Sequence, residues 1–210
     1  MQLMRVIHVS VFTLLTMVLV ACGGNNTTTV DLESVDFMAV PSDLDGLVVT
    51  LTSIQGGFDA EDVLLDVGFP FCLGERTQWT FVTPNGSSLE IRIDLSIPVG
   101  MGAGDYQAAF GAQDADTVGL IASVSEPTGD AATDVENFND LAFVDVQQGA
   151  IRLESVPTAE GEILSGSFQF NLRPTSFETD QAERAEIDLD QEMLVTGAFS
   201  VVASADAICS

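Results

Sequence analysis

Apolar and polar residues alternate along most of the chain, in short runs separated by Gly, Pro and Asn. The clearest run covers residues 89–97, where every second residue is Leu or Ile and the residues between them are Glu, Arg, Asp and Ser. A period of two residues indicates a strand with one face on a core and the other in water. The pattern is β from Val30 onward, and further strands are expected at residues 47–54, 63–69, 79–83, 106–110, 118–124, 141–146, 150–156, 164–172 and 193–203.

Two short sequences between these runs predict hairpins. The Asn-Gly pair at 85–86 follows one strand and precedes the next, and it supplies the two positive φ angles of a type I′ turn. The Gln-Gln-Gly sequence at 147–149 separates two apolar runs and predicts a second hairpin. Two longer polar breaks leave room for brief helices, around residues 131–139 and after Asp180.

Two glycines occupy equivalent positions in similar sequences. Gly166 and Gly197 each lie in an apolar-x-x-Gly-small-Phe run. This similarity predicts either a weak internal repeat or two adjacent strands that need a small residue where their backbones come close.

Together these patterns predict an all-β fold. Strand-length segments at short spacing, separated by Gly and Pro, are typical of an antiparallel sandwich or a barrel-like domain. We expect a single acidic domain over residues 30–210, with at most one or two short helices and no second domain.

The first residues have the composition of a secretory signal. A small positive region with Arg5 and His8 precedes an apolar run at 9–20, which is too short to span a membrane. Residues 1–21 are therefore interpreted as a signal peptide, and the polar residues 22–29 as a flexible tether.

The end of this leader, Leu19-Val20-Ala21-Cys22, resembles the lipobox of bacterial lipoproteins. The resemblance implies cleavage before Cys22, lipidation of that cysteine and stable anchoring by two or more acyl chains. Because Gly23, and not Asp, follows the cysteine, it favours the outer membrane of a Gram-negative cell envelope. The alternative is an ordinary signal peptide with Cys22 as a plain cysteine.

The C-terminal third carries a second, less specific resemblance. Its glycine and aromatic spacing is similar to that of all-β bacterial envelope lipoproteins of unassigned function, and such relatives offer no catalytic or binding residues to transfer. The positions that carry it are Gly149, Ile151, Gly166, Phe168, Phe170, Gly197, Phe199 and Cys209.

Two cysteines remain after the leader and Cys22 are set aside. Cys72 and Cys209 form an even pair in an oxidising compartment, and this predicts a disulfide that closes a loop of more than a hundred residues. Two buried free thiols are the alternative.

The charge balance excludes two classes of partner. The chain has 32 Asp and Glu against 6 Arg and no Lys, which gives a formal net charge of −26. Such a surface repels nucleic acid and anionic lipid, so neither is expected as a specific partner. A halophilic protein that gains stability with added salt is the preferred hypothesis, because salt screens the self-repulsion. A generic solvated acidic surface is the alternative.

The residue inventory disfavours catalysis. His8 is the only histidine and leaves with the leader, which excludes histidine-dependent nucleophiles and histidine-ligated zinc in the mature chain. A two-carboxylate hydrolase stays open, but Trp79 and Tyr106 are the only Trp and Tyr, a thin supply for a sugar-binding cleft.

Calcium is the one cofactor that the acidic loops suggest, because hard cations prefer several carboxylate and carbonyl oxygens. Solvated loop carboxylates with no bound ion are the alternative reading of the same residues. The candidate ligands are Asp59, Glu61, Asp62, Asp114, Asp116, Asp130, Asp134 and Glu136.

The sequence therefore predicts a lipid-anchored, non-catalytic domain of the cell envelope, with a structural or interaction role and an unknown partner. A ligand- or calcium-binding module of the cell surface is the alternative, and a carboxylate-dependent hydrolase is less favoured.

Overall fold

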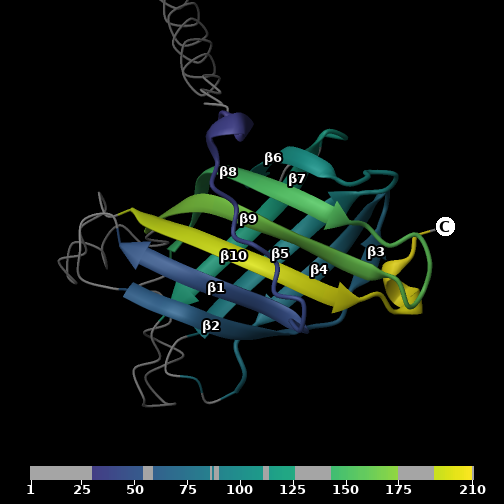
Figure 1. The fold of residues 1–210 in the computed structure, drawn as a ribbon, viewed down its shortest axis with the longest axis horizontal. Helices are drawn as coiled ribbons and strands as arrows, with labels where there is room; N and C mark the ends of the chain where they lie inside the picture. The colour runs from purple at the N-terminus through teal and green to yellow at the C-terminus, as the bar shows by residue number, and fades with distance from the viewer. Residues whose placement is uncertain are drawn as a thin grey trace, which may run out of the picture.

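The structure, a computed structural model, describes residues 30–53, 59–85, 87, 90–110, 114–125, 143–174 and 192–209. The expected all-β character is confirmed: this part contains ten strands in one sheet and two 3-10 turns (Figure 1). The elements are η1 (Leu32–Ser34), β1 (Gly46–Ser53), β2 (Asp59–Val67), β3 (Phe71–Leu73), β4 (Arg76–Val82), β5 (Glu90–Pro98), β6 (Gly104–Phe110), β7 (Thr117–Ser125), β8 (Phe143–Ser155), β9 (Ile163–Pro174), β10 (Met193–Val202) and η2 (Ala205–Ala207). The helices expected near 131–139 and Asp180 lie outside the described residues.

The strands follow the order β2-β1-β10-β9-β8-β6-β7-β5-β4-β3. Most neighbours are antiparallel, but β6 and β7 run in the same direction, with Gln107 opposite Thr117. The expectation of a purely antiparallel sheet was therefore wrong, and the sheet is mixed. Period-two alternation reports which face of a strand is buried, but it carries no information about the direction of the neighbouring strand.

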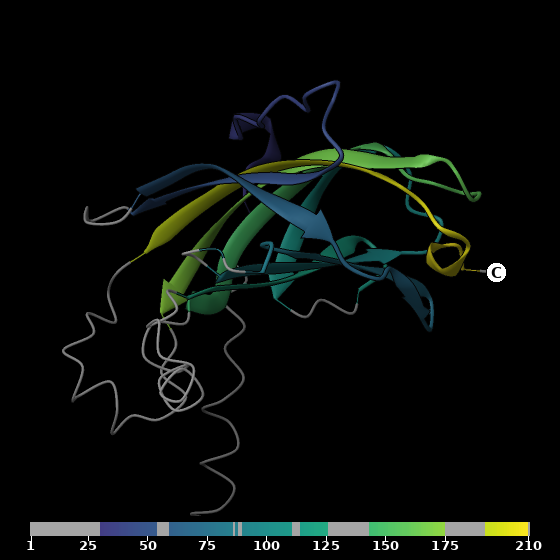
Figure 2. The same ribbon diagram turned by 90° about the horizontal axis from the view of Figure 1, so that it is seen from below.

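The sheet folds back on itself because β2 changes partner along its length. Its first residues pair with β1, whereas Asp66 and Val67 pair with Val82 and Phe81 of β4. Strands β8, β9, β10 and β1 consequently lie in front of β4, β5 and β7 in Figure 1, and the turned view shows the two groups as separate layers (Figure 2).

The space between these layers is filled by apolar side chains. On β5 the residues Ile91, Ile93, Leu95 and Ile97 are at most 2 % exposed, as the alternation at 89–97 predicts. The bulkiest fully buried side chains come from both layers and include four phenylalanines, whose neighbouring ring centroids lie 5.2–6.3 Å apart. These largest residues are Trp79, Phe81, Phe168, Phe170 and Phe199.

Gly166 and Gly197 lie on adjacent strands, as one of the two sequence interpretations predicts. In the antiparallel β9–β10 pair, Gly166 faces Phe199 and Gly197 faces Phe168. A Cβ on Gly197 would approach the Phe168 ring to 2.5 Å, and one on Gly166 would collide with the carbonyl of Arg152. Each phenylalanine ring therefore occupies the space that the opposite glycine leaves empty.

One predicted hairpin is confirmed and the other is wrong. Strands β4 and β5 do pair as a hairpin, but Val82 faces Arg92, so the connection is longer than a two-residue turn. Asn85 does not have a positive φ, so the expected type I′ turn was wrong. The Ser87 N–H donates to the Pro84 carbonyl and closes a turn at Asn-Gly within that longer loop. The Gln-Gln-Gly sequence is no hairpin, because β8 runs through it with a register shift. A Cβ on Gly149 would lie 3.0 Å from that of Phe170, so close packing, and not a turn, explains this glycine.

The segment at residues 30–45, here called the strap, is not the strand that the β pattern from Val30 predicts. Asp31 caps η1 by accepting from the Glu33 N–H, and the rest of the strap is irregular up to the start of β1. Figure 1 shows the strap crossing in front of β8, β9 and β10, and Figure 2 places it outside the layer that these strands form.

Candidate functional site

The folded sheet has two outer faces that differ in what covers them. The strapped face is the outer surface of β8, β9, β10 and β1, over which the strap runs (Figure 1). The open face is the outer surface of β3, β4, β5 and β7. Both faces carry exposed residues that a partner or ligand could reach.

Two hydrogen bonds to a side-chain amide fix the beginning of the strap. The Val30 N–H donates to Oε1 of Gln107 at 3.0 Å, and Nε2 of Gln107 donates to the Val30 carbonyl at 2.6 Å. The Gln107 amide thus pairs with Val30 as a neighbouring strand would, and it joins the strap to β6.

An arginine holds the middle of the strap. The Arg152 guanidinium lies 4.5 Å from the centroid of the Phe37 ring, in a cation–π contact. The same guanidinium donates to both carboxylate oxygens of Asp105, at 2.7 and 2.8 Å. These bonds lower the pKa of Asp105 and raise that of Arg152. Asp105 therefore orients the cation on which the strap's aromatic residue stacks.

The strapped face is lined with small residues. On β9 and β10 the outward positions include Ser165, Ser167, Ala198 and Ser200, which alternate with the core phenylalanines. Ser167 and Ala198 are fully buried although they point away from the core. Their burial on the outer side fits the path of the strap, because short side chains let a chain lie close to the sheet.

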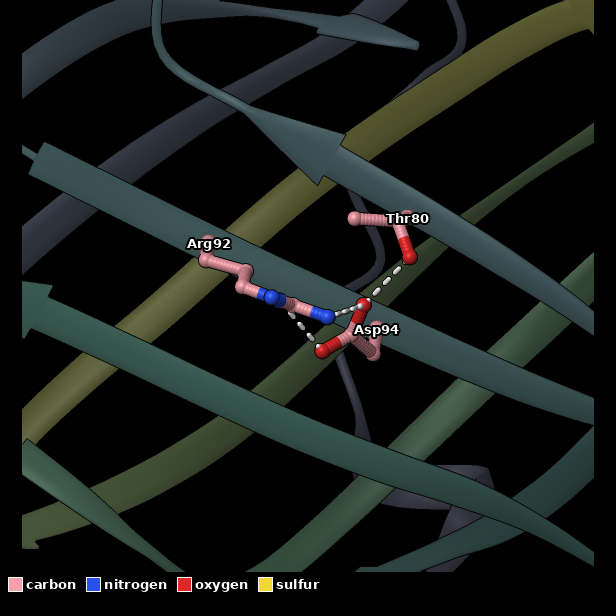
Figure 3. Close-up of polar contacts among 3 residues, drawn as sticks. All are labelled: Thr80, Arg92 and Asp94. Carbon is pink, nitrogen blue, oxygen red and sulfur yellow. Dashed lines mark hydrogen bonds and ion pairs between the residues drawn. The ribbon is translucent and has the colours of Figure 1, made fainter. Parts of the chain in front are cut away.

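The open face carries a group of three polar residues at its centre (Figure 3). Nε of Arg92 donates to Oδ2 of Asp94 at 2.8 Å, and a second guanidinium nitrogen donates to Oδ1 at 3.2 Å. The Thr80 hydroxyl donates to the same Oδ1 at 2.5 Å. The bonds to Asp94 raise the pKa of Arg92. Arg92 is thus held by its own strand, whereas Arg152 contacts a segment distant in sequence.

Exposed apolar side chains surround this group. Ile121 of β7 faces Asp94 and is 42 % exposed, and Val82 of β4 faces Arg92 and is 36 % exposed. Along the same outer face, Phe71 and Leu73 of β3 are 47 % and 63 % exposed. The open face therefore combines a charge-balanced centre with an apolar surround.

A buried arginine supports the edge of the open face. Arg76 is 9 % exposed and donates to the Ser96 hydroxyl and to the carbonyls of Ser96, Asp114 and Thr117, at 2.7–2.9 Å. Burial lowers the pKa of this guanidinium, and the charge of Asp114 opposes that shift. With neutral oxygens as its acceptors, Arg76 ties β4 to β5 and to the start of β7, which is a structural role.

The predicted disulfide is present beside that edge. Cys72 of β3 is bonded to Cys209, with the two Cα atoms 5.6 Å apart. The bond fixes the short strand β3 to the C-terminal segment that follows η2. The other cysteine of interest, Cys22, lies outside the described residues, so its lipidation stays a prediction.

An open hollow of about 600 Å³ lies between the strap and the ends of β8 and β9. Its wall includes Glu162, whose carboxylate accepts from the Thr158 N–H and hydroxyl and from the Ala159 N–H, at 2.7–3.1 Å. These bonds lower the pKa of Glu162. The carboxylate is therefore occupied in closing the β8–β9 loop.

The candidate calcium ligands do not converge in the described part of the chain. Asp59, Glu61 and Asp62 lie in β2 and not in a loop, with Asp62 at φ 55° beside a register shift. Asp114 and Asp116 precede β7, where the Asp114 carbonyl binds Arg76. Among the described residues, no three His, Cys, Asp or Glu side chains are grouped as a metal site. Calcium binding stays a prediction for titration to test; the remaining candidates, outside the described residues, are Asp130, Asp134 and Glu136.

Sequence reasoning missed the strap and the arginine contacts. The Arg92–Asp94 pair could have been found, because the two residues occupy the same face of an alternating run and stand two positions apart. The Arg152–Phe37 contact joins residues more than a hundred positions apart and has no local signal. No described helix has the length and apolar character needed to cross a membrane. No protein-family model, curated protein or solved structure matches the chain.

Proposed function

We propose that this chain is a lipid-anchored, non-catalytic domain of the bacterial cell envelope that acts through its outer faces. The observation that carries the proposal is the filled core. Among the described residues, Trp79, Phe81 and Phe199 are at most 1 % exposed and pack between the two layers. Function then falls to the surface and to the lipid anchor that the lipobox implies.

The arrangement of the sheet supports a rigid surface-presenting domain. We propose that the sheet forms a flattened barrel, closed where β2 pairs with β4. The interior is then a packed core and not a ligand cavity, as in small barrels filled by side chains. For a ligand-binding module, the alternative, the open hollow beside the strap is a candidate site among the described residues.

Intact-mass measurement tests the anchoring directly. The full chain is produced in a Gram-negative host supplied with an alkyne-tagged fatty acid, beside a Cys22→Ser variant that retains the other two cysteines. We expect the unsubstituted protein to begin at Cys22, to carry acyl groups and to fractionate with the outer membrane, and the variant to carry none. Mature protein with a free thiol at Cys22 would contradict the proposal.

A further inference from the structure

We propose that the open face is a docking surface for a protein partner that presents apolar side chains bordered by Lys and Arg. The proposal rests on the proposed lipid anchoring only for the direction in which this face points. Its chemistry is argued from the face itself.

The strand register brings the relevant side chains together. Thr80, Asp94 and Ile121 stand opposite one another on β4, β5 and β7, and the next row contains Val82 and Arg92. Because all five point away from the core, they form one continuous patch (Figure 3 shows its polar members). A partner can bury exposed apolar side chains beside polar groups that already satisfy each other without leaving a charge unpaired.

The charges around the patch define the partner. Arg92 and Asp94 neutralise each other at the centre, whereas Asp66 lies opposite Val82 and Glu90 lies two residues before Arg92 on β5. The chain carries a net charge of −26, so a second copy would be repelled, as would an anionic lipid surface. Apolar side chains bordered by positive ones complement this face best.

The position of the strap separates the open face from the anchor. The strap begins at Val30 on the strapped face, and Figure 2 shows η1 and the open face on opposite sides of the domain. The eight residues 22–29 reach at most about 28 Å when fully extended. A short tether that leaves from the strapped face directs the open face away from the bilayer, toward other envelope proteins.

Binding of defined peptides tests the proposal without knowledge of the natural partner. The probes are a soluble peptide of alternating Val and Thr with two Lys at each end, the same peptide with Ser in place of Val, and the Val peptide with Glu in place of Lys. The receptor is the whole chain carrying Cys22→Ser, so failure of lipidation does not affect the result. Fluorescence anisotropy of the labelled peptides is measured at physiological salt.

Paired variants locate the binding. Val82→Ser with Ile121→Ser removes apolar area from the open face. Ile163→Ser with Val202→Ser is the matched control. These two residues face each other where β9 starts and β10 ends, away from the open face, and they are 47 % and 61 % exposed. Because all four side chains are partly exposed, both double variants should keep their melting temperatures.

We expect the Lys-flanked Val peptide to bind about tenfold more tightly than its Ser version. A difference of this order in affinity follows from the burial of two partly exposed apolar side chains. The preference should vanish in the open-face variant and persist in the control, and the Glu-flanked peptide should not bind. Equal binding of the Val and Ser peptides, or loss in the control variant, overturns the proposal. So does self-association, or binding to phosphatidylcholine vesicles, that depends on Val82 and Ile121.

Discussion

The two outer faces of this sheet are built from the same alternation but differ in what covers them (Figure 1 and Figure 2). Where the strap crosses β9 and β10 the outward residues include Ser and Ala, of which Ser167 and Ala198 are fully buried. On β4, β5 and β7 they include Val82, Arg92 and Ile121, and they are exposed. A period of two residues thus separates the core side of a strand from its outer side, and small outer residues such as Ser167 and Ala198 occur where the strap covers the sheet (Figure 1).

The arginines follow the same division. Arg152 on the strapped face stacks on an aromatic residue of a distant segment, while Arg92 on the open face is bound by its own strand and by Thr80. Arg152 thus makes a structural contact between distant segments, whereas Arg92 balances charge locally.

Removal of the disulfide should produce the largest effect, and it should fall on the open-face side. Replacing Cys72 and Cys209 by Ser frees a loop of 137 residues and is expected to cost about 4–5 kcal/mol of unfolding free energy in the chain-entropy model. Urea denaturation measures the loss. Hydrogen exchange should show added opening at β3, with the strap still protected. Equal opening of the strap would mean that the two faces are not independent.

A bulky residue beneath the strap should have an intermediate effect. Ala198→Leu places a large side chain at a fully buried outward position, and overpacking of that kind costs about 1–3 kcal/mol. Ser123→Leu is the matched change on the open face, where Ser123 lies opposite Arg92, and surface changes of this kind usually stay within about 0.5 kcal/mol. Urea unfolding compares the two variants. Limited proteolysis within residues 30–45 should accelerate only in Ala198→Leu; equal behaviour of both variants would refute the role of small residues.

Acidification should give the smallest effect, confined to the strapped face. Arg152 lowers the pKa of Asp105 from its ordinary 3.8, so their pairing contributes fully above that pH and is lost as the pH falls through the lower folded value. An NMR titration should therefore show Asp105 with a depressed pKa, and Phe37 should loosen as Asp105 protonates. Arg152→Met should return the pKa of Asp105 toward 3.8, and an unchanged value would exclude the pairing.

The strands and the disulfide could be predicted from the sequence, but the strap that covers one face of the sheet could not. The alternation at 89–97 and the Gly-small-Phe runs reflect packing within a strand or between neighbouring strands. Packing of this kind leaves a repeated pattern in a short stretch of sequence, so it could be predicted. The turn predicted at Gln147 to Gly149 was wrong because the sequence does not distinguish a glycine required by close packing from a glycine required by a turn. The strap and Arg152 depend on contacts between distant segments, and residues 30–45 have no period that could reveal them.

The pair of hydrogen bonds between Val30 and the Gln107 side-chain amide also determines how the domain would respond to mechanical load. A pull on an anchored N-terminus enters the sheet at β6, at the edge of the strapped face. Force would peel the strap from Gln107 and then from Arg152 before it reached any ladder between strands. The sixteen residues 30–45 would thus be released while the core stayed intact, so with the proposed lipid anchor the strap would lengthen before force reached the folded domain.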